Sequence, residues 1–233
     1  MRFHVRLWAV LITAFLLLSG CAAPRQESIS LSSDFFKTGA GKIGIAMPEA
    51  PKPDTFFPGA DCLLCIAAAS VNHRSLTNEV QTWPTDEFQS LGVEMQALLK
   101  SQGQLAVLIA EPLKLQDLPD RKNAAPGQAR KDFSSLQQRA GIDRLLVIQL
   151  LQAGVQRSHS AYFPTGPAMA TLKAEAYLVD LSTHQLAWYE TVDLSRSAEG
   201  NWDEAPKFPG LTNAYFQILE LSKEQIKKPF VKP

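Results

Sequence analysis

The chain has few cysteines and lacks the residue patterns that mark most catalytic and nucleic-acid-binding proteins. Its 233 residues include three cysteines, and its 23 basic and 23 acidic side chains cancel. A balanced charge gives no basic surface for a nucleic acid. No Gly-x-Ser-x-Gly elbow and no His-Glu-x-x-His helix occurs, so the usual serine-hydrolase and zinc-peptidase motifs are excluded. The sequence also contains no internal repeat and only one long hydrophobic run.

The remaining polar residues form no metal or catalytic constellation. A zinc site needs four ligands, and the histidines that follow residue 20 stand at no ligand spacing: His73, His159 and His184. Three aspartates fall at the ends of expected strands, where a carboxylate usually caps a turn: Asp143, Asp180 and Asp193. We therefore expect no catalytic residue, no bound metal and no cofactor other than the covalent lipid discussed next.

The N-terminus has the three parts of a secretory leader. Arg2 and Arg6 precede an apolar run, and Leu18-Ser19-Gly20-Cys21 closes it. This closing tetrapeptide resembles the lipobox of bacterial lipoproteins. The resemblance implies that residues 1–20 are a signal peptide and that Cys21 is acylated, with palmitate among the expected chains. The alternative is an ordinary signal peptide that ends near a cysteine.

The lipoprotein resemblance also implies a location. Related lipoproteins that stay in the inner membrane tend to carry Asp after the acylated cysteine, whereas this chain has Ala22. We therefore expect the protein at the outer membrane, facing the periplasm. Residues 21–41 are mostly polar and small and are interpreted as a lipidated flexible tether that ends in a short strand or turn near Phe35 and Phe36. Residues 42–233 are expected to form one periplasmic domain, slightly acidic because the leader removes two basic residues.

The apolar pattern of this domain predicts a mixed α/β (α+β) architecture. Alternating or continuous apolar residues predict five strands, at 42–47, 105–109, 144–151, 171–181 and 185–194. Apolar residues three and four apart predict four helices, at 61–71, 86–103, 133–140 and 211–226. We expect a mixed sheet covered by helices, with a long C-terminal β-hairpin followed by a final helix.

Four local features carry more specific expectations. The continuous apolar run of strand 144–151 indicates a position in the centre of the sheet. Strand 105–109 is also expected to be buried, and the proline-rich segment 48–58 to be irregular. Asp61 and Asp86 are expected to cap the first two helices. The first helix is too apolar for a solvated surface, so it should be a buried core helix or, alternatively, an assembly surface.

A family resemblance appears in the second half of the chain. Residues 140–148 and the hairpin 172–192 resemble periplasmic lipoprotein domains related to the TolB amino-terminal domain and the curli secretion lipoprotein. The segments 62–65 and 208–215 resemble a family of uncharacterised proteobacterial outer-membrane lipoproteins. These resemblances imply a location and a fold, but a fold does not specify a function.

Cys62 and Cys65 are the only thiols that remain when Cys21 is acylated. Three residues apart in a helical turn, they lie within disulfide range, and the periplasm is oxidising. A structural disulfide is the first interpretation. A redox-active dithiol at a helix N-terminus is the second, although the intervening Leu63-Leu64 pair is apolar. Reduced thiols in the core are the third.

Two loops carry aromatic residues that could bind a partner. Tyr162 and Phe163 lie in the first loop, and Trp202 and Phe208 lie in the second. Exposed aromatic side chains often anchor protein contacts. The alternative is that they fold back and cover the core.

These observations leave three hypotheses for function. The preferred one is a non-enzymatic, lipid-anchored periplasmic domain that binds or scaffolds another cell-envelope component. The second is a membrane-tethered thiol-disulfide oxidoreductase that uses Cys62 and Cys65. The third is an oligomeric secretion or transport accessory, by resemblance to the curli lipoprotein. The sequence does not specify the partner or the oligomeric state.

Overall fold

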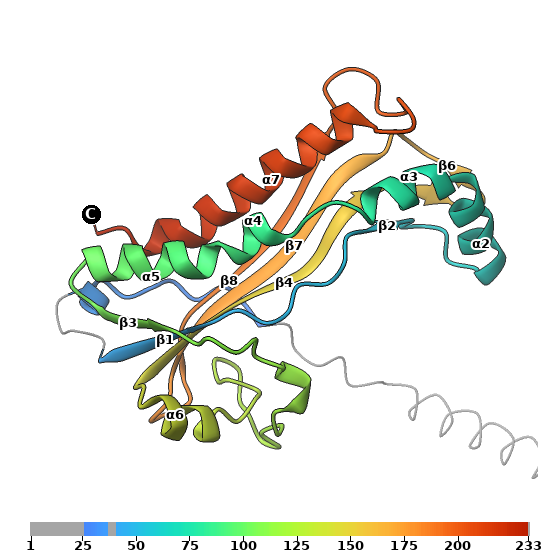
Figure 1. Ribbon diagram of the computed structural model, residues 1–233. Coiled ribbons are helices and arrows are strands. Elements are labelled where there is room, and N and C mark those ends of the chain that lie inside the picture. Colours follow the sequence, from blue (N-terminus) through green and yellow to red (C-terminus); the bar gives the residue numbers. More distant parts are fainter. Residues whose placement is uncertain (1–25, 37–40, 233) are drawn as a thin grey trace, which may run out of the picture.

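A computed structural model describes residues 26–36 and 41–232 and shows an elongated α+β fold built along one mixed sheet (Figure 1). The predicted signal peptide and the predicted acylation site, Cys21, lie outside the described residues. The described part contains no helix that is both long enough and apolar enough to span a membrane.

The sheet has six strands in two pairing modes. Its main order is β3-β1-β4-β7-β8, and β2 pairs with the far end of β4. The pairs β1–β3, β1–β4 and β2–β4 are parallel, whereas β4–β7 and β7–β8 are antiparallel. The strands are β1 (Lys42–Ala46), β2 (Asp54–Phe56), β3 (Leu105–Leu108), β4 (Arg144–Gln156), β7 (Met169–Asp180) and β8 (Leu186–Ser197). A separate small hairpin is formed by β5 (His159–Ser160) and β6 (Phe163–Pro164).

Helices cover the two faces of the sheet unequally. In Figure 1, α4, α5 and α7 lie along one face, α6 lies beyond the other face at one end, and α2 and α3 lie at the opposite end. The helices are α2 (Leu63–Asn72), α3 (Arg74–Val80), α4 (Asp86–Gln89), α5 (Leu91–Ser101), α6 (Ser134–Ala140) and α7 (Pro209–Lys227). Short 3-10 turns occur at Ser33–Phe36, Leu115–Asp117 and Lys228–Phe230. Ile29 pairs with Tyr189, and Phe35 is buried in the larger core, so residues 29–36 belong to the folded domain and not to the tether predicted at 21–41. The predicted mixed sheet, long hairpin and final helix are confirmed.

The central strand β4 separates two hydrophobic cores. Because successive side chains of a strand point to opposite faces, Leu146 and Ile148 join the larger core, which includes α5 and α7. Leu145 and Val147 join the smaller core beside α6. All four side chains are fully buried. The prediction of a central strand, covered on both faces, is correct.

An irregularity in β4 keeps its far half in the larger core. The register with β7 shifts between Leu150 and Gln152. The extra residue, Leu151, is 47% exposed, and Ala153 and Val155 then face the same core as Leu150. A bulge of this kind bends the strand and increases its twist, and β4 continues past it toward the end of the molecule that carries α2 and α3.

The structure corrects several sequence expectations for local structure. The segment 48–58 is not wholly irregular, because β2 forms within it. The helix expected at 86–103 is two helices that meet at Ser90, and Thr85 rather than Asp86 is the N-cap residue. Strand β3 is not fully buried, since it lies at the sheet edge and Leu105 is 71% exposed. The sequence interpretation missed α3, which follows α2 after one residue.

A glycine allows the β2–β4 pair to close. Gly154 pairs with Asp54 and has φ of +134°, a conformation that side-chain-bearing residues rarely adopt. A Cβ at this position would overlap the backbone carbonyl oxygen of Asp54. Strand β2 in turn leads toward α2, so this close approach positions that end of the molecule.

Candidate functional site: an apolar tip

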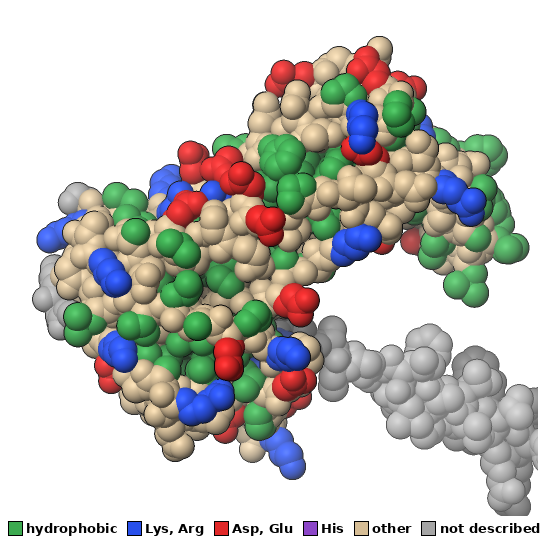
Figure 2. All heavy atoms as spheres, viewed as in Figure 1, with side chains coloured by type: hydrophobic (Ala, Val, Ile, Leu, Met, Phe, Trp, Pro, Cys, Tyr) green, Lys and Arg blue, Asp and Glu red, His purple; other side chains and the backbone are tan. Residues whose placement is uncertain are grey.

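Exposed hydrophobic side chains gather at the end of the molecule formed by α2, α3 and the β5–β6 hairpin (Figure 2). Their exposed fractions range from 45% to 87%. We call this set the apolar tip: Leu63, Leu64, Ile66, Val71, Tyr162 and Phe163. Single exposed hydrophobic residues are normal, but a contiguous group commonly marks a binding surface.

Helix α2 is therefore not the buried core helix that the sequence favoured. Only Cys65 and Ala69 are buried, and because they are four residues apart they form one narrow stripe. The opposite side of the helix, which includes Leu63 at 87% exposure, faces away from the protein. A helix that is apolar on its outer side is normally covered by something else, which favours the alternative of an assembly surface.

The start of α2 is held by a disulfide. Cys62 and Cys65 are bonded, with their Cα atoms 5.0 Å apart. The Cys62 Sγ also accepts a hydrogen bond of 2.9 Å from the Cys65 backbone N–H, so Cys62 is the N-cap residue in place of the expected Asp61. Cys62 is exposed, whereas Cys65 is 3% exposed. The bridge fixes the two exposed leucines that it encloses.

The β5–β6 hairpin is attached to the segment that precedes α2. The His159 N–H donates to the Pro58 carbonyl (2.7 Å), and the Ala161 N–H donates to the Gly59 carbonyl (3.0 Å). Gly59 has φ of +86°, and a Cβ there would overlap the His159 carbonyl oxygen. The Tyr162 hydroxyl lies 3.7 Å from the Cys62 Sγ. Two segments that are 100 residues apart in sequence thus form one surface.

A partly buried polar cluster lies beside the tip, where α2 ends. The Arg157 guanidinium donates to His73 Nε2 (2.8 Å), so the other ring nitrogen, Nδ1, carries the proton and donates to the Ala69 carbonyl (2.8 Å). Burial lowers the pKa of His73, and the nearby Arg157 charge lowers it further. Arg157 also lies 4.6 Å from the centre of the Trp202 ring, a cation-π contact. The cluster holds α2, β4 and the loop before α7 together.

The four predicted partner-binding aromatics separate into two groups. Tyr162 is 49% exposed and Phe163 is 74% exposed, and both belong to the apolar tip. Trp202 is half-buried over Arg157. Phe208 is 4% exposed within the larger core, so it does not offer a surface contact as predicted. Phe208 immediately precedes α7, and its packing under that helix takes its ring away from solvent.

The aspartates at strand ends accept hydrogen bonds from neighbouring turns. Asp143 accepts from the Lys42 N–H (2.7 Å), and Asp180 accepts from both the N–H and the hydroxyl of Ser182. Asp193 forms an exposed ion pair with Lys173 (3.4 Å). Within residues 26–36 and 41–232, no group of three or more His, Cys, Asp and Glu side chains could hold a metal ion.

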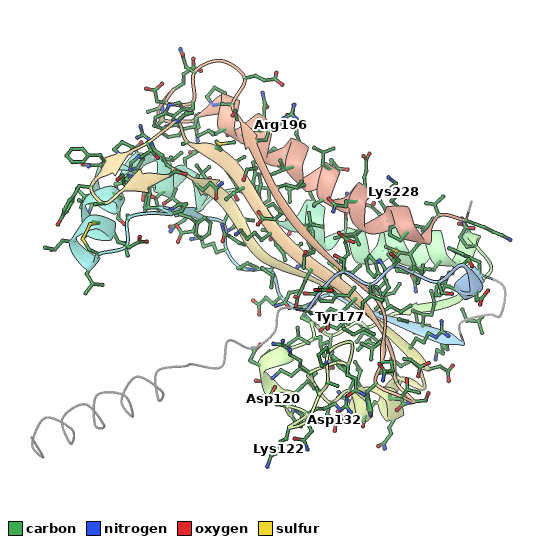
Figure 3. The ribbon with its side chains drawn as sticks, turned by 180° about the vertical axis from the view of Figure 1, so that it is seen from behind. Asp120, Lys122, Asp132, Tyr177, Arg196 and Lys228 are labelled. Carbon is green, nitrogen blue, oxygen red and sulfur yellow. A yellow bond between two sulfur atoms is a disulfide. The ribbon has the colours of Figure 1, made fainter. Side chains whose placement is uncertain are left out.

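The sequence interpretation missed a cavity of about 680 Å³ on the sheet face that carries α6. Its lining includes Glu175, Tyr177 and Tyr189 from the sheet, and residues 115–116, 128–131 and 133 from the segment between β3 and β4. Figure 3 shows Tyr177 where the sheet meets the lobe that carries Asp120. Burial raises the pKa of Glu175, although the Tyr189 hydroxyl donates to it (3.2 Å) and partly offsets this. The β7–β8 register pairs Tyr177 with Tyr189, so the two rings lie on the same face of the sheet.

The chain was compared with known proteins. No known family profile matches it, and no curated protein sequence matches it. It is similar to a solved structure of the PelC dodecamer from Paraburkholderia phytofirmans (11% identity, TM-score 0.37, covering 90% of this chain and 98% of that one). It is also similar to XCC0632 from Xanthomonas campestris (13% identity, TM-score 0.35, covering 80% of this chain and 84% of that one). A third similar structure is lipoprotein GNA1162 from Neisseria meningitidis (14% identity, TM-score 0.30, covering 81% of this chain and 99% of that one). At these TM-scores the similarities identify neither a fold family nor a function.

Proposed function

We propose that the protein is a non-enzymatic, lipid-anchored periplasmic docking domain of the outer membrane, and that its apolar tip binds another component of the cell envelope. The observation that carries this proposal is the apolar tip itself, six large hydrophobic side chains exposed together on a disulfide-held helix and the adjoining hairpin. The leader and its lipobox support the location.

The composition of the tip suits docking. Covering an exposed Leu or Phe side chain stabilises a complex by roughly 1.5–3 kcal/mol. Several such side chains together can offset the entropy lost on association. The disulfide at Cys62 and the polar cluster at the end of the helix fix the surface before binding, so less ordering is required when the partner arrives.

Photo-crosslinking in living cells tests this function. A photoreactive residue replaces Leu64 in the tip or, as a matched control, Val93, which is 58% exposed on α5 outside the tip. We expect position 64 to form a discrete crosslinked product with an envelope protein or with lipid, and position 93 to form none. Equal crosslinking from both positions, or none from position 64, contradicts the proposal.

A second candidate function is thiol-disulfide exchange at Cys62 and Cys65. It is favoured by one observation: an exposed cysteine at the N-terminus of a ten-residue helix, bonded to a buried cysteine one turn later. In this reaction a substrate dithiol would become a disulfide, while the Cys62–Cys65 bond accepts two electrons and two protons.

The Cys65→Ser variant distinguishes the two candidates. If exchange is the function, the exposed Cys62 thiol of this variant should accumulate mixed disulfides with envelope proteins, which a nonreducing gel of whole cells detects. The Cys62→Ser variant, whose remaining thiol is buried, serves as the control. Absence of mixed disulfides, together with a bridge that survives glutathione buffers, removes this second candidate.

A further inference from the structure

The exposed side of α2 is uncharged and mainly apolar. No residue from Cys62 to Asn72 is charged. The exposed positions of the helix are the apolar residues Leu63, Leu64, Ile66 and Val71, the small residues Ala67 and Ser70, and the polar Asn72, while exposed Asp61 and Arg74 flank its two ends. Protein interfaces typically contain about one hydrogen bond per 100–200 Å² and a polar rim. The hydrocarbon region of a bilayer requires no hydrogen-bonding side chains from the surface that enters it.

The aromatic members of the tip have the distribution found at a membrane surface. Phe163 is 74% exposed and purely apolar, whereas Tyr162 is 49% exposed and carries a hydroxyl beside the Cys62 sulfur. Tyrosine rings favour the boundary between acyl chains and headgroups, because one end is apolar and the other is polar. Phe163 is therefore the more exposed of the two rings, and the phenol of Tyr162 lies beside the sulfur of the disulfide.

The length of chain before the described domain keeps the domain close to a membrane. Cys21, the expected lipid attachment site, precedes Gln26 by five residues, which span at most about 18 Å when fully extended. Gln26 is fixed to the domain, because its side-chain oxygen accepts a hydrogen bond from the Gly127 N–H (3.0 Å). Ile29 then pairs with Tyr189 in β8. The lipid and the domain are thus joined by a short segment.

The tip lies far along the sheet from this attachment point. Tyr189 pairs with Tyr177, which pairs with Val147 of β4. Strand β4 continues from Val147 to Gln156, where it meets β2. A strand segment of this length spans about 30 Å. The attachment point and the tip are therefore two separated points along the long direction of the molecule (Figure 1).

From these observations we propose that the apolar tip inserts into the acyl-chain boundary of the same membrane that holds the Cys21 lipid. This inference rests on the proposed docking function and names its partner as a lipid bilayer. Two contacts about 30 Å apart hold the sheet with its long direction along the membrane surface. The lipid retains the protein, and the tip sets its orientation.

Vesicle flotation tests this inference with the mature full-length chain carrying Cys21→Ser, so that binding depends on the tip alone. The probe is large unilamellar vesicles of phosphatidylethanolamine and phosphatidylglycerol. We expect the protein to float with the vesicles and the Leu63→Glu/Leu64→Glu variant to partition at least tenfold less. Because apolar contacts drive binding, the wild-type partition should change less than twofold between low and moderate salt.

Two further variants guard against an effect of misfolding. Val93→Glu adds the same charge at an exposed apolar position on α5 and should partition as the parent does. Phe163→Glu perturbs the tip from the hairpin, without changing α2, and should weaken partition at least threefold. Circular dichroism and quantification of the Cys62–Cys65 bridge confirm that each variant is folded.

The outcomes separate the bilayer from other occupants. If the parent protein does not float, or if Val93→Glu lowers partition as much as the tip variants, bilayer insertion is wrong. In that case a protein crosslinked at position 64 in cells leaves the docking function standing with a protein partner. If a measurement of molecular size instead shows that the parent protein is a dimer and that the tip variants are monomers, a second copy of the chain covers the tip. Absence of any crosslinked product from position 64 contradicts the docking function itself, whether or not the protein floats.

Discussion

The Gly154→Ala variant is expected to lose about 3 kcal/mol of unfolding free energy and to release β2 from the sheet. The backbone at Gly154 has φ of +134°, which alanine tolerates poorly, and the added Cβ would overlap the Asp54 carbonyl oxygen. Both groups belong to paired strands, so relief requires the strands to separate. Because β2 leads into the tip, hydrogen exchange should quicken in α2 and α3 more than in β7 and β8. Urea unfolding with exchange mass spectrometry measures both effects.

Gly166→Ala is the matched control for this prediction. A Cβ at Gly166 would meet no heavy atom within 4 Å, and its backbone is not in the left-handed region. Its unfolding free energy should stay within about 0.5 kcal/mol of the parent. A Gly154→Ala protein as stable and as protected in α2 as the parent would show that the β2–β4 contact does not hold the tip.

The second large effect involves a charge cluster between α5 and α7. The Lys223 side chain is 5% exposed, and its ammonium lies 2.6 Å from Glu94 and 3.1 Å from Glu220. Lys227 lies 2.7 Å from the other oxygen of Glu94. Partial burial alone would raise the pKa of Glu94, but hydrogen bonds from Lys223, Lys227 and Ser90 outweigh it and lower that pKa to about 2.

We expect Glu94→Gln to lower the unfolding free energy by about 2 kcal/mol at pH 7, because it leaves a nearly buried ammonium with weaker partners. The pKa of Glu94 is lower when folded than its ordinary 4.5. Its stabilisation is therefore complete above that value and disappears as pH falls toward 2. Urea unfolding of the parent and the Glu94→Gln protein between pH 7 and pH 2 should show the difference between their unfolding free energies shrinking as the pH falls.

Asp193→Asn provides the surface comparison for the Glu94 prediction. Asp193 pairs with Lys173 at 3.4 Å, and both side chains are largely exposed. Removing this pair should cost less than about 0.5 kcal/mol. If Glu94→Gln is equally mild, or if its effect is independent of pH, the Glu94–Lys223 contact does not stabilise the fold as described.

The sheet was predictable because its strands carry their own signals. Periodicity places the hairpin, and the continuous apolar run of β4 identifies the sheet centre. Strand β2 was not predicted, because its three residues lie between prolines and are too few to show an alternating apolar pattern. The boundary between α4 and α5 at Ser90 was not predicted, because apolar residues at helical spacing continue across it, from Phe88 to Leu91.

The candidate site was predictable in its parts but not in its assembly. The cysteine pair and the Tyr162–Phe163 loop are visible in the sequence, but nothing local indicates that they are neighbours. The hydrophobicity of α2 favours a covered helix, yet it does not tell whether the protein's own core or another molecule would cover it. The fate of Phe208 depends on how α7 docks, which is a tertiary property.

Hydroxyl-radical footprinting of the apolar tip in native envelopes tests the central claim most directly. Leu63, Leu64 and Phe163 are compared between isolated envelopes and the purified Cys21→Ser protein, with exposed Val93 and Leu221 as internal references. We predict at least fivefold less oxidation of the three tip residues in envelopes, and equal oxidation of the two references. Equal oxidation of the tip in both samples would mean that nothing covers it, and would contradict its role as a docking surface.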